Sequence, residues 1–192
     1  MLSDQLRRWS RPLLEVMASG LARVGLSPDA VTLIGLGLNV AVGAVLAMGH
    51  LRVGGLLVLV ASLADSLDGA LARHVNKVSP FGAFFDSTVD RYSETALFAG
   101  LLWYFAGAGA RQESMLVLVV LAGSLLVSYT RARAEGLGIA CTVGLFSRAE
   151  RMVVLAIGLA IGQPLATLWV LAIFGHFTAV QRILHVRRQI AA

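Results

Sequence analysis

Long apolar runs, separated by short polar or glycine-containing breaks, follow one another along this chain of 192 residues. Most runs approach the roughly 20 residues that an α-helix needs to cross the hydrocarbon core of a bilayer. Breaks such as Gly49 and Gln163-Pro164 are typical of tight turns between consecutive helices. We therefore predict six membrane spans, at about residues 29–48, 53–73, 82–106, 112–135, 148–162 and 165–187.

The segment before the first span, residues 4–24, has a different pattern. Apolar residues recur there at helical spacing, with arginines between them. The apolar positions are Leu6, Trp9, Leu13, Met17, Leu21 and Val24, and the arginines are Arg7, Arg8, Arg11 and Arg23. This predicts an interfacial amphipathic helix rather than a cleavable signal peptide, with a local disturbance at Pro12. Ser27-Pro28 then predicts the start of the first span.

Composition supports the same class of protein. The chain is 57% hydrophobic and 14% charged, whereas soluble domains are about 45–50% apolar and about 25% charged. We expect an all-α integral membrane protein whose residues 1–192 form one domain. The single Cys141 excludes an intramolecular disulfide and a cysteine metal site, and we expect it to be a small apolar filler.

Basic residues are distributed unevenly between the two sides of the predicted bundle. Of the 16 lysines and arginines, Arg52 and Arg111 fall on one side and the rest fall on the other. The positive-inside rule makes the second side cytoplasmic and places both termini there, in the inner or plasma membrane. That side would attract anionic membrane lipids, and we expect no nucleic-acid partner.

Four aspartates lie inside the predicted spans. Asp65 and Asp68 share a helix face near the end of the second span, and Asp86 and Asp90 share one near the start of the third. A charged residue at membrane depth costs roughly 2.5–3.5 kcal/mol on insertion scales, so such residues are functional candidates. Carboxylate oxygens favour hard ions, and the four residues could hold two cations, Mg²⁺ or Mn²⁺.

Small residues accompany the aspartates. Gly69, Ala72 and Gly82 would let a ligand or a neighbouring helix approach the backbone closely. Arg73 lies one turn beyond Gly69, where its guanidinium could hold a phosphate.

A second group of candidates is basic. Arg131, Arg148, Arg151 and Arg182 lie near the cytoplasmic ends of three spans, and together they could bind an acceptor phosphate. Membrane orientation alone is the competing explanation for each of them. We expect Arg133 to pair with Glu135 or Glu150, and the four histidines have no metal-binding spacing.

The motif Asp65-x2-Asp68-Gly69-x2-Ala72-Arg73-x8-Gly82-x3-Asp86-x3-Asp90 resembles the signature of the CDP-alcohol phosphotransferases. The resemblance implies a homodimer with a di-metal site in each subunit, open to the cytoplasmic interface. It implies that Asp65, Asp68 and Asp86 are metal ligands and that Asp90 completes the site and acts as the base. It also places Gly69 and Arg73, with Ala72 and Gly82, against the CDP-linked lipid.

Other segments resemble the actinobacterial phosphatidylinositol-phosphate synthases. They are residues 23–32, 128–136, 148–151 and 180–182. In those enzymes basic residues at the positions of Arg131, Arg148 or Arg151, and Arg182 line an inositol-phosphate pocket. The chain differs in having Arg131 where that subfamily usually has Lys and Ala149 where it usually has Pro.

Three functions remain open at this point. The first is transfer of a phosphatidyl group from CDP-diacylglycerol to inositol phosphate, with release of CMP. The second is the same chemistry with glycerol 3-phosphate as the acceptor. The third is an ion or proton transporter, against which no ladder of polar groups continues to the far side of the membrane.

Overall fold

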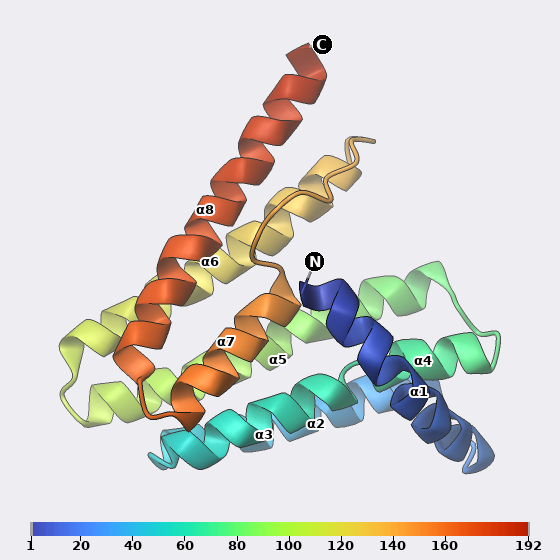
Figure 1. Cartoon of the computed structure of the whole chain (residues 1–192), viewed down its shortest axis with the longest axis horizontal. Coiled ribbons are helices and arrows are strands. Elements are labelled where there is room, and N and C mark those ends of the chain that lie inside the picture. Colours follow the sequence, from blue (N-terminus) through green and yellow to red (C-terminus); the bar gives the residue numbers. More distant parts are fainter. Residues whose placement is uncertain (1, 192) are drawn as a thin grey trace.

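The computed structural model describes residues 2–191, and it describes side chains at residue 12 and from 14 to 191. Within that part every regular element is an α-helix. The helices are α1 (Leu2–Arg23), α2 (Pro28–Ala47), α3 (Leu51–Ala64), α4 (Leu67–His74), α5 (Pro80–Gly107), α6 (Arg111–Glu135), α7 (Arg148–Ala160) and α8 (Pro164–Ala191). Figure 1 shows α6 and α8 side by side, with α7 between α8 and α3, and α1 crossing α4.

Serine caps fix where two of the long helices begin. The Ser27 side chain accepts a hydrogen bond from the Ala30 N–H at 3.2 Å, and Pro28 occupies the first helical position. This confirms the predicted start at Ser27-Pro28. The same chemistry recurs at Ser79, which accepts from the Gly82 N–H at 3.0 Å. As a result α5 begins at Pro80, two residues before the predicted third span.

The predicted second span is interrupted. We expected one helix over 53–73, but α3 ends at Ala64 and α4 begins at Leu67. Asp65 and Ser66 keep helical backbone angles, so the chain continues onward although its regular hydrogen-bond ladder lapses. The Ser66 hydroxyl bonds back to the Ser62 carbonyl at 3.3 Å, a local alternative to backbone pairing.

The N-terminal helix is continuous through Pro12, so the disturbance expected there is not a break. Leu14 and Ala18 are buried and belong to a cluster with Leu67 and Leu71 of α4. Val16 stays 70% exposed. The predicted apolar positions Leu6, Trp9 and Leu13, and the arginines Arg7, Arg8 and Arg11, lie outside the described side chains.

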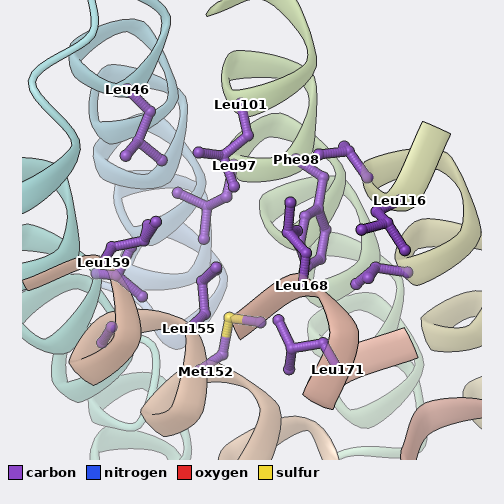
Figure 2. Close-up of a cluster of buried hydrophobic side chains, with 14 of the residues drawn as sticks. Leu46, Leu97, Phe98, Leu101, Leu116, Met152, Leu155, Leu159, Leu168 and Leu171 are labelled. Atoms are coloured by element: carbon purple, nitrogen blue, oxygen red, sulfur yellow. The ribbon is translucent and has the colours of Figure 1, made fainter. Parts of the chain in front are cut away.

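Leucine-rich surfaces of α2, α5, α6, α7 and α8 meet in one core (Figure 2). Glycines let the helices approach closely: a Cβ added at Gly43 of α2 would lie 2.5 Å from the Ala96 carbonyl oxygen of α5. A Cβ at Gly55 of α3 would lie 2.7 Å from the Ala156 carbonyl oxygen of α7. Backbone contact of this kind holds α2 and α3 against α5 and α7, which are the helices that carry the polar site.

The outer surface of the bundle is apolar. Leu33, Leu56, Trp103 and Ile173 are each more than half exposed although they lie in the middle of helices. By length and composition, four segments of the described chain could cross a membrane: Pro28–Ala47, Leu51–His74, Arg111–Glu135 and Pro164–Ala191. Extensive exposed apolar surface of this kind is expected where lipid is the solvent, so the chain is an all-helical integral membrane protein.

Candidate active site

The four aspartates come together from three helices. Asp65 ends α3, Asp68 lies in the first turn of α4, and Asp86 and Asp90 lie one turn apart in α5. The interruption between α3 and α4 therefore falls inside the site.

Asp68 is the most completely held of the four. Its Oδ2 accepts from the Thr32 hydroxyl at 2.6 Å and its Oδ1 accepts from the Gly69 N–H at 2.5 Å. The carboxyl of Asp86 lies within hydrogen-bonding reach of Asp68. Two carboxyls this close require a proton or a cation between them, because two bare carboxylates would repel.

Asp65 is held by α2 and α7. Its Oδ1 accepts from Asn39 Nδ2 at 3.1 Å, and its Oδ2 accepts from Arg148 Nη2 at 2.6 Å. Gly35 of α2 leaves the room for this carboxylate, because a Cβ there would lie 2.8 Å from Asp65 Oδ1. Thr32, Gly35 and Asn39 therefore form one supporting face of α2, which sequence reasoning missed. A signal was present, since two polar residues seven positions apart share a face of an apolar helix.

Arg148 bridges two of the acids. Its Nη2 contacts Asp65 and its Nη1 lies 2.9 Å from Asp90 Oδ1, while its Nε is buried without a hydrogen-bond acceptor. The Arg148 guanidinium therefore lies between Asp65 and Asp90. Within the described side chains, no three acidic, histidine or cysteine groups lie close enough together to form a metal site as they stand. The assignment of the four aspartates to cations stays a prediction.

The donor set nevertheless fits divalent cations. All four side chains offer carboxylate oxygens, which Mg²⁺ and Mn²⁺ prefer. Neighbouring groups fix two of them in place: Thr32 and Gly69 orient Asp68, and Asn39 orients Asp65. Hydrogen-bonded carboxylates of this kind are typical of metal ligands. Asp68 and Asp86 lie close together, so a cation held by these residues would offset the repulsion between their carboxylates.

The predicted basic cluster is present, but each member has a partner. Arg131 forms an exposed ion pair with Glu135 at 2.8 Å. The pairing of Arg133 with Glu135 or Glu150 stays a prediction. Arg182 is 5% exposed and donates from Nε to the Val143 carbonyl at 2.9 Å. Both Arg131 and Arg151 are close enough to Arg182 for their charges to act on it.

Arg151 is the most deeply buried of these arginines. Its Nε and Nη2 each donate to Glu94 at 2.9 Å, and its Nη1 donates to the Phe146 carbonyl at 3.2 Å. The side chains of Arg151 and Glu94 are 1% and 3% exposed. A guanidinium held in this way has little capacity left for a ligand. Glu94, one turn beyond Asp90, was also missed from the sequence.

The remaining predicted residues line the α4 side. Gly69 and Arg73 are adjacent in space: a Cβ at Gly69 would lie 3.4 Å from Arg73 Nη1. Arg73 is exposed and Ala72 is half-buried. Gly82 lies in the first turn of α5, where an added Cβ would approach Asp29 Oδ1 at 3.9 Å.

A family model described as CDP-alcohol phosphatidyltransferase matches residues 26–185 of the chain. The chain belongs to the CDP-alcohol phosphatidyltransferase family. The match extends from just before α2 nearly to the end of α8. It therefore includes all four aspartates and the arginines of the candidate site, which are Arg73, Arg131, Arg148, Arg151 and Arg182. The chain is therefore a transferase, as the motif predicted.

Relatives within this family have named activities. The chain is 38% identical over 180 residues to a phosphatidylinositol phosphate synthase of Mycobacteroides abscessus, covering 89% of this chain and 82% of the relative. It is 35% identical over 192 residues to an archaetidylinositol phosphate synthase of Methanothermobacter thermautotrophicus, covering 96% of each.

A solved member of the family has the same fold. The crystal structure of Mycobacterium tuberculosis phosphatidylinositol phosphate synthase with CDP-DAG bound matches with a TM-score of 0.85 and 36% identity. The match covers 91% of this chain and 94% of that one. A second structure of the same enzyme is a complex with manganese and citrate, and it also matches with a TM-score of 0.85.

Proposed function

We propose that this chain transfers the phosphatidyl group of CDP-diacylglycerol to a hydroxyl of inositol phosphate and releases CMP. The observation that carries the proposal is that Arg148, at the start of α7, contacts both Asp65 and Asp90, while Asp68 and Asp86 lie close together beside them. Acids that can hold cations lie there next to cations that can hold an anionic acceptor. The named activities of the family relatives, including one structure with CDP-DAG bound, support this choice of substrates.

In this proposal Asp65, Asp68, Asp86 and Asp90 hold two divalent cations, Mg²⁺ or Mn²⁺, in line with the manganese in a family structure. Bound cations would offset the negative charge that develops on the transferred phosphate and on the leaving CMP. Gly69, Ala72 and Gly82 leave room for the cytidine diphosphate against the backbone. Arg73, adjacent to Gly69, contacts a phosphate of the donor.

The acceptor is oriented by the basic cluster. Arg131, Arg148 and Arg182 hold its phosphate and direct a hydroxyl toward the donor. Asp90 accepts the proton of that hydroxyl, at the border between the acidic and basic groups. Arg151, which the sequence grouped with these residues, is engaged by Glu94, so we assign it the task of holding α7 against α5.

An acceptor assay tests the function directly. Purified enzyme is given CDP-diacylglycerol, Mg²⁺ or Mn²⁺, and one acceptor at a time: inositol phosphate, free inositol or glycerol 3-phosphate. We expect CMP release with inositol phosphate to exceed that with the other two by at least about tenfold in kcat/KM, because only that acceptor offers both phosphate and ring hydroxyls. Preference for glycerol 3-phosphate would establish the second candidate, and metal-independent CMP release would contradict the proposed chemistry.

We also propose an arrangement in the membrane. Residues 1–192 form one domain with six spans, in which the 28-residue α5 and the 13-residue α7 cross together with the four candidate spans named above. Helix α1 lies in the cytoplasmic interface, both termini are cytoplasmic, and the protein is a homodimer in the inner or plasma membrane. Exposed apolar residues, Val16 in α1 and Val24 directly after its last residue Arg23, support an interfacial position for that helix.

Alkaline phosphatase fusions test the six spans, because this reporter is active only after export. With six spans, fusions after Gly109 and after Gln163 both give active reporter, and a fusion after Arg188 gives none. If only the four candidate spans cross the membrane, and α5 and α7 do not, the Gly109 fusion becomes inactive because α5 no longer exports it. An active reporter after Arg188 would contradict the cytoplasmic C-terminus.

A further inference from the structure

Arg148 contacts two of the carboxylates that the proposed function assigns to cations. Its two terminal nitrogens lie 2.6 Å from Asp65 Oδ2 and 2.9 Å from Asp90 Oδ1. Asp65 comes from the end of α3 and Asp90 from α5, so the guanidinium crosslinks the two sides of the acidic site. The contact is buried on the acidic side and partly open on the basic side: the Asp65 side chain is 7% exposed, and that of Arg148 is 23% exposed.

We propose that Arg148 is an internal counter-ion that competes with the divalent cations for Asp65 and Asp90. The inference rests on the proposed function, because it takes these residues to be the metal ligands. In the absence of metal the guanidinium neutralises the two carboxylates. When divalent cations bind, they take over these oxygens and Arg148 is released toward the acceptor side of the site.

Competition follows from charge. Asp65 Oδ1 accepts from the neutral amide of Asn39, whereas Oδ2 accepts from the positively charged Arg148, so a cation that binds Asp65 would be repelled by the guanidinium and not by the amide. Asn39 is 2% exposed and its Nδ2 also bonds to the Gly35 carbonyl at 3.0 Å, which ties it to α2. Arg148 is the donor that can leave, because its side chain reaches solvent.

The bonding of Arg148 itself supports an exchangeable position. Its two terminal nitrogens, Nη1 and Nη2, contact the acids, whereas its Nε is buried without an acceptor. A buried donor without a partner is unfavourable, which lowers the barrier to leaving. By contrast, Arg151, three residues further along α7, is satisfied at all three nitrogens by Glu94 and Phe146.

The backbone under Arg148 is fixed, so release requires only movement of the side chain. Arg148 is the first residue of α7, and the turn before it is closed by the Glu150 carboxylate, which accepts from the Ser147 N–H at 3.0 Å. The buried pair of Arg151 and Glu94 holds the next turn against α5. The guanidinium can therefore exchange between the acids and an acceptor phosphate while the helix stays in place.

The test is Mn²⁺ binding by the purified, EDTA-treated full chain in detergent, with free Mn²⁺ measured by electron paramagnetic resonance. Arg148→Gln removes the competing cation. Two controls remove the same charge elsewhere: Arg91→Gln next to Asp90 in sequence, and Arg187→Gln in the exposed C-terminal turns. We expect Arg148→Gln to bind Mn²⁺ at least about tenfold more tightly than wild type, as expected for losing charge-assisted hydrogen bonds that the metal must displace. The controls should stay within about threefold.

Each outcome decides the matter. Unchanged or weaker Mn²⁺ binding by Arg148→Gln overturns the proposal, and an equal gain in Arg91→Gln overturns it too, because local charge alone would then suffice. Absence of Mn²⁺ binding in wild type and all variants contradicts the metal site itself, which is a failure of the proposed function. If Arg148→Gln does not fold, Arg148→Met decides: its long unbranched side chain fills similar space without a charge, so tighter binding supports the proposal and unchanged binding overturns it.

A second readout uses methyl phosphate as a probe for the acceptor's anionic group. If Mn²⁺ releases Arg148, methyl phosphate should tighten Mn²⁺ binding in wild type, because binding linkage is reciprocal. The same addition should leave Arg148→Gln unchanged. Equal tightening in both proteins would show that the anion acts on the metal without Arg148.

Discussion

Asp90→Asn is expected to lower kcat for CMP release by about 10²–10⁴-fold, the usual worth of a general base. Asparagine keeps the size of the side chain but cannot accept the proton of the acceptor hydroxyl. Asp90 lies 2.9 Å from Arg148 and one helical turn from Asp86, so it is where the acidic and basic groups meet. Binding of CDP-diacylglycerol, measured by titration without acceptor, should change far less than kcat, because Asp65, Asp68 and Asp86 remain.

Two further variants serve as controls for Asp90→Asn. Glu113→Gln removes an acid from the first turn of α6, at the opposite end of the bundle, and should leave kcat within about twofold of wild type. Asp90→Glu restores a carboxylate that is one methylene longer, and should recover part of the lost rate. Full activity in Asp90→Asn would eliminate Asp90 as the base and would require another proton acceptor in the site.

The aspartates could be predicted from sequence because their signal is local. The four-residue spacing puts Asp86 and Asp90 on one face of α5, and the chain keeps helical backbone angles between Asp65 and Asp68 although the regular helix is interrupted there. The resemblance to the family motif then suggested which aspartates are metal ligands and which one is the base. The interruption at Asp65 and Ser66 was not predicted, because both residues keep helical angles and only the hydrogen-bond register lapses.

Contacts between helices were harder to predict. Thr32 and Asn39 of α2 donate hydrogen bonds to Asp68 and Asp65. They reach these acids only because of how α2 is rotated against α5, and the close approach at Gly43 and Gly100 sets that rotation. The assignment of Arg148 and Arg151 to one phosphate pocket had the same weakness. Three positions apart on α7, they meet different acids of α5, so that one borders the site and the other is buried below it.

Arg148 and Arg151 have different roles at the start of α7. Glu94 and Asp90 are four residues apart on α5, and they face Arg151 and Arg148 respectively. The inner pair is closed to water and fixes the register of the two helices. The outer pair borders the half-buried site, where a charge can be exchanged. A helix of 13 residues is thus held firmly enough to present a mobile guanidinium at its first position.

Glu94→Gln is expected to lower the free energy of unfolding by about 3–5 kcal/mol, because it leaves the buried Arg151 guanidinium without its counter-charge. Unfolding is measured by SDS titration of the purified protein in mixed micelles. The matched control is Glu135→Gln, which breaks the ion pair with Arg131 where both side chains are about half exposed. That change should cost at most about 1 kcal/mol.

A double variant then separates support from ligand binding. Glu94→Leu with Arg151→Met removes both charges and fills similar volume, so stability should return toward wild type, as buried ion pairs often allow. If Arg151 only holds α7 in place, the KM for the acceptor in this variant stays within a few-fold of wild type. If Arg151 contacts the acceptor phosphate, KM instead rises by more than about tenfold even though the protein is stable, since a charge-assisted contact is lost. Stability and KM together therefore show whether the basic cluster binds the acceptor with Arg151 or without it.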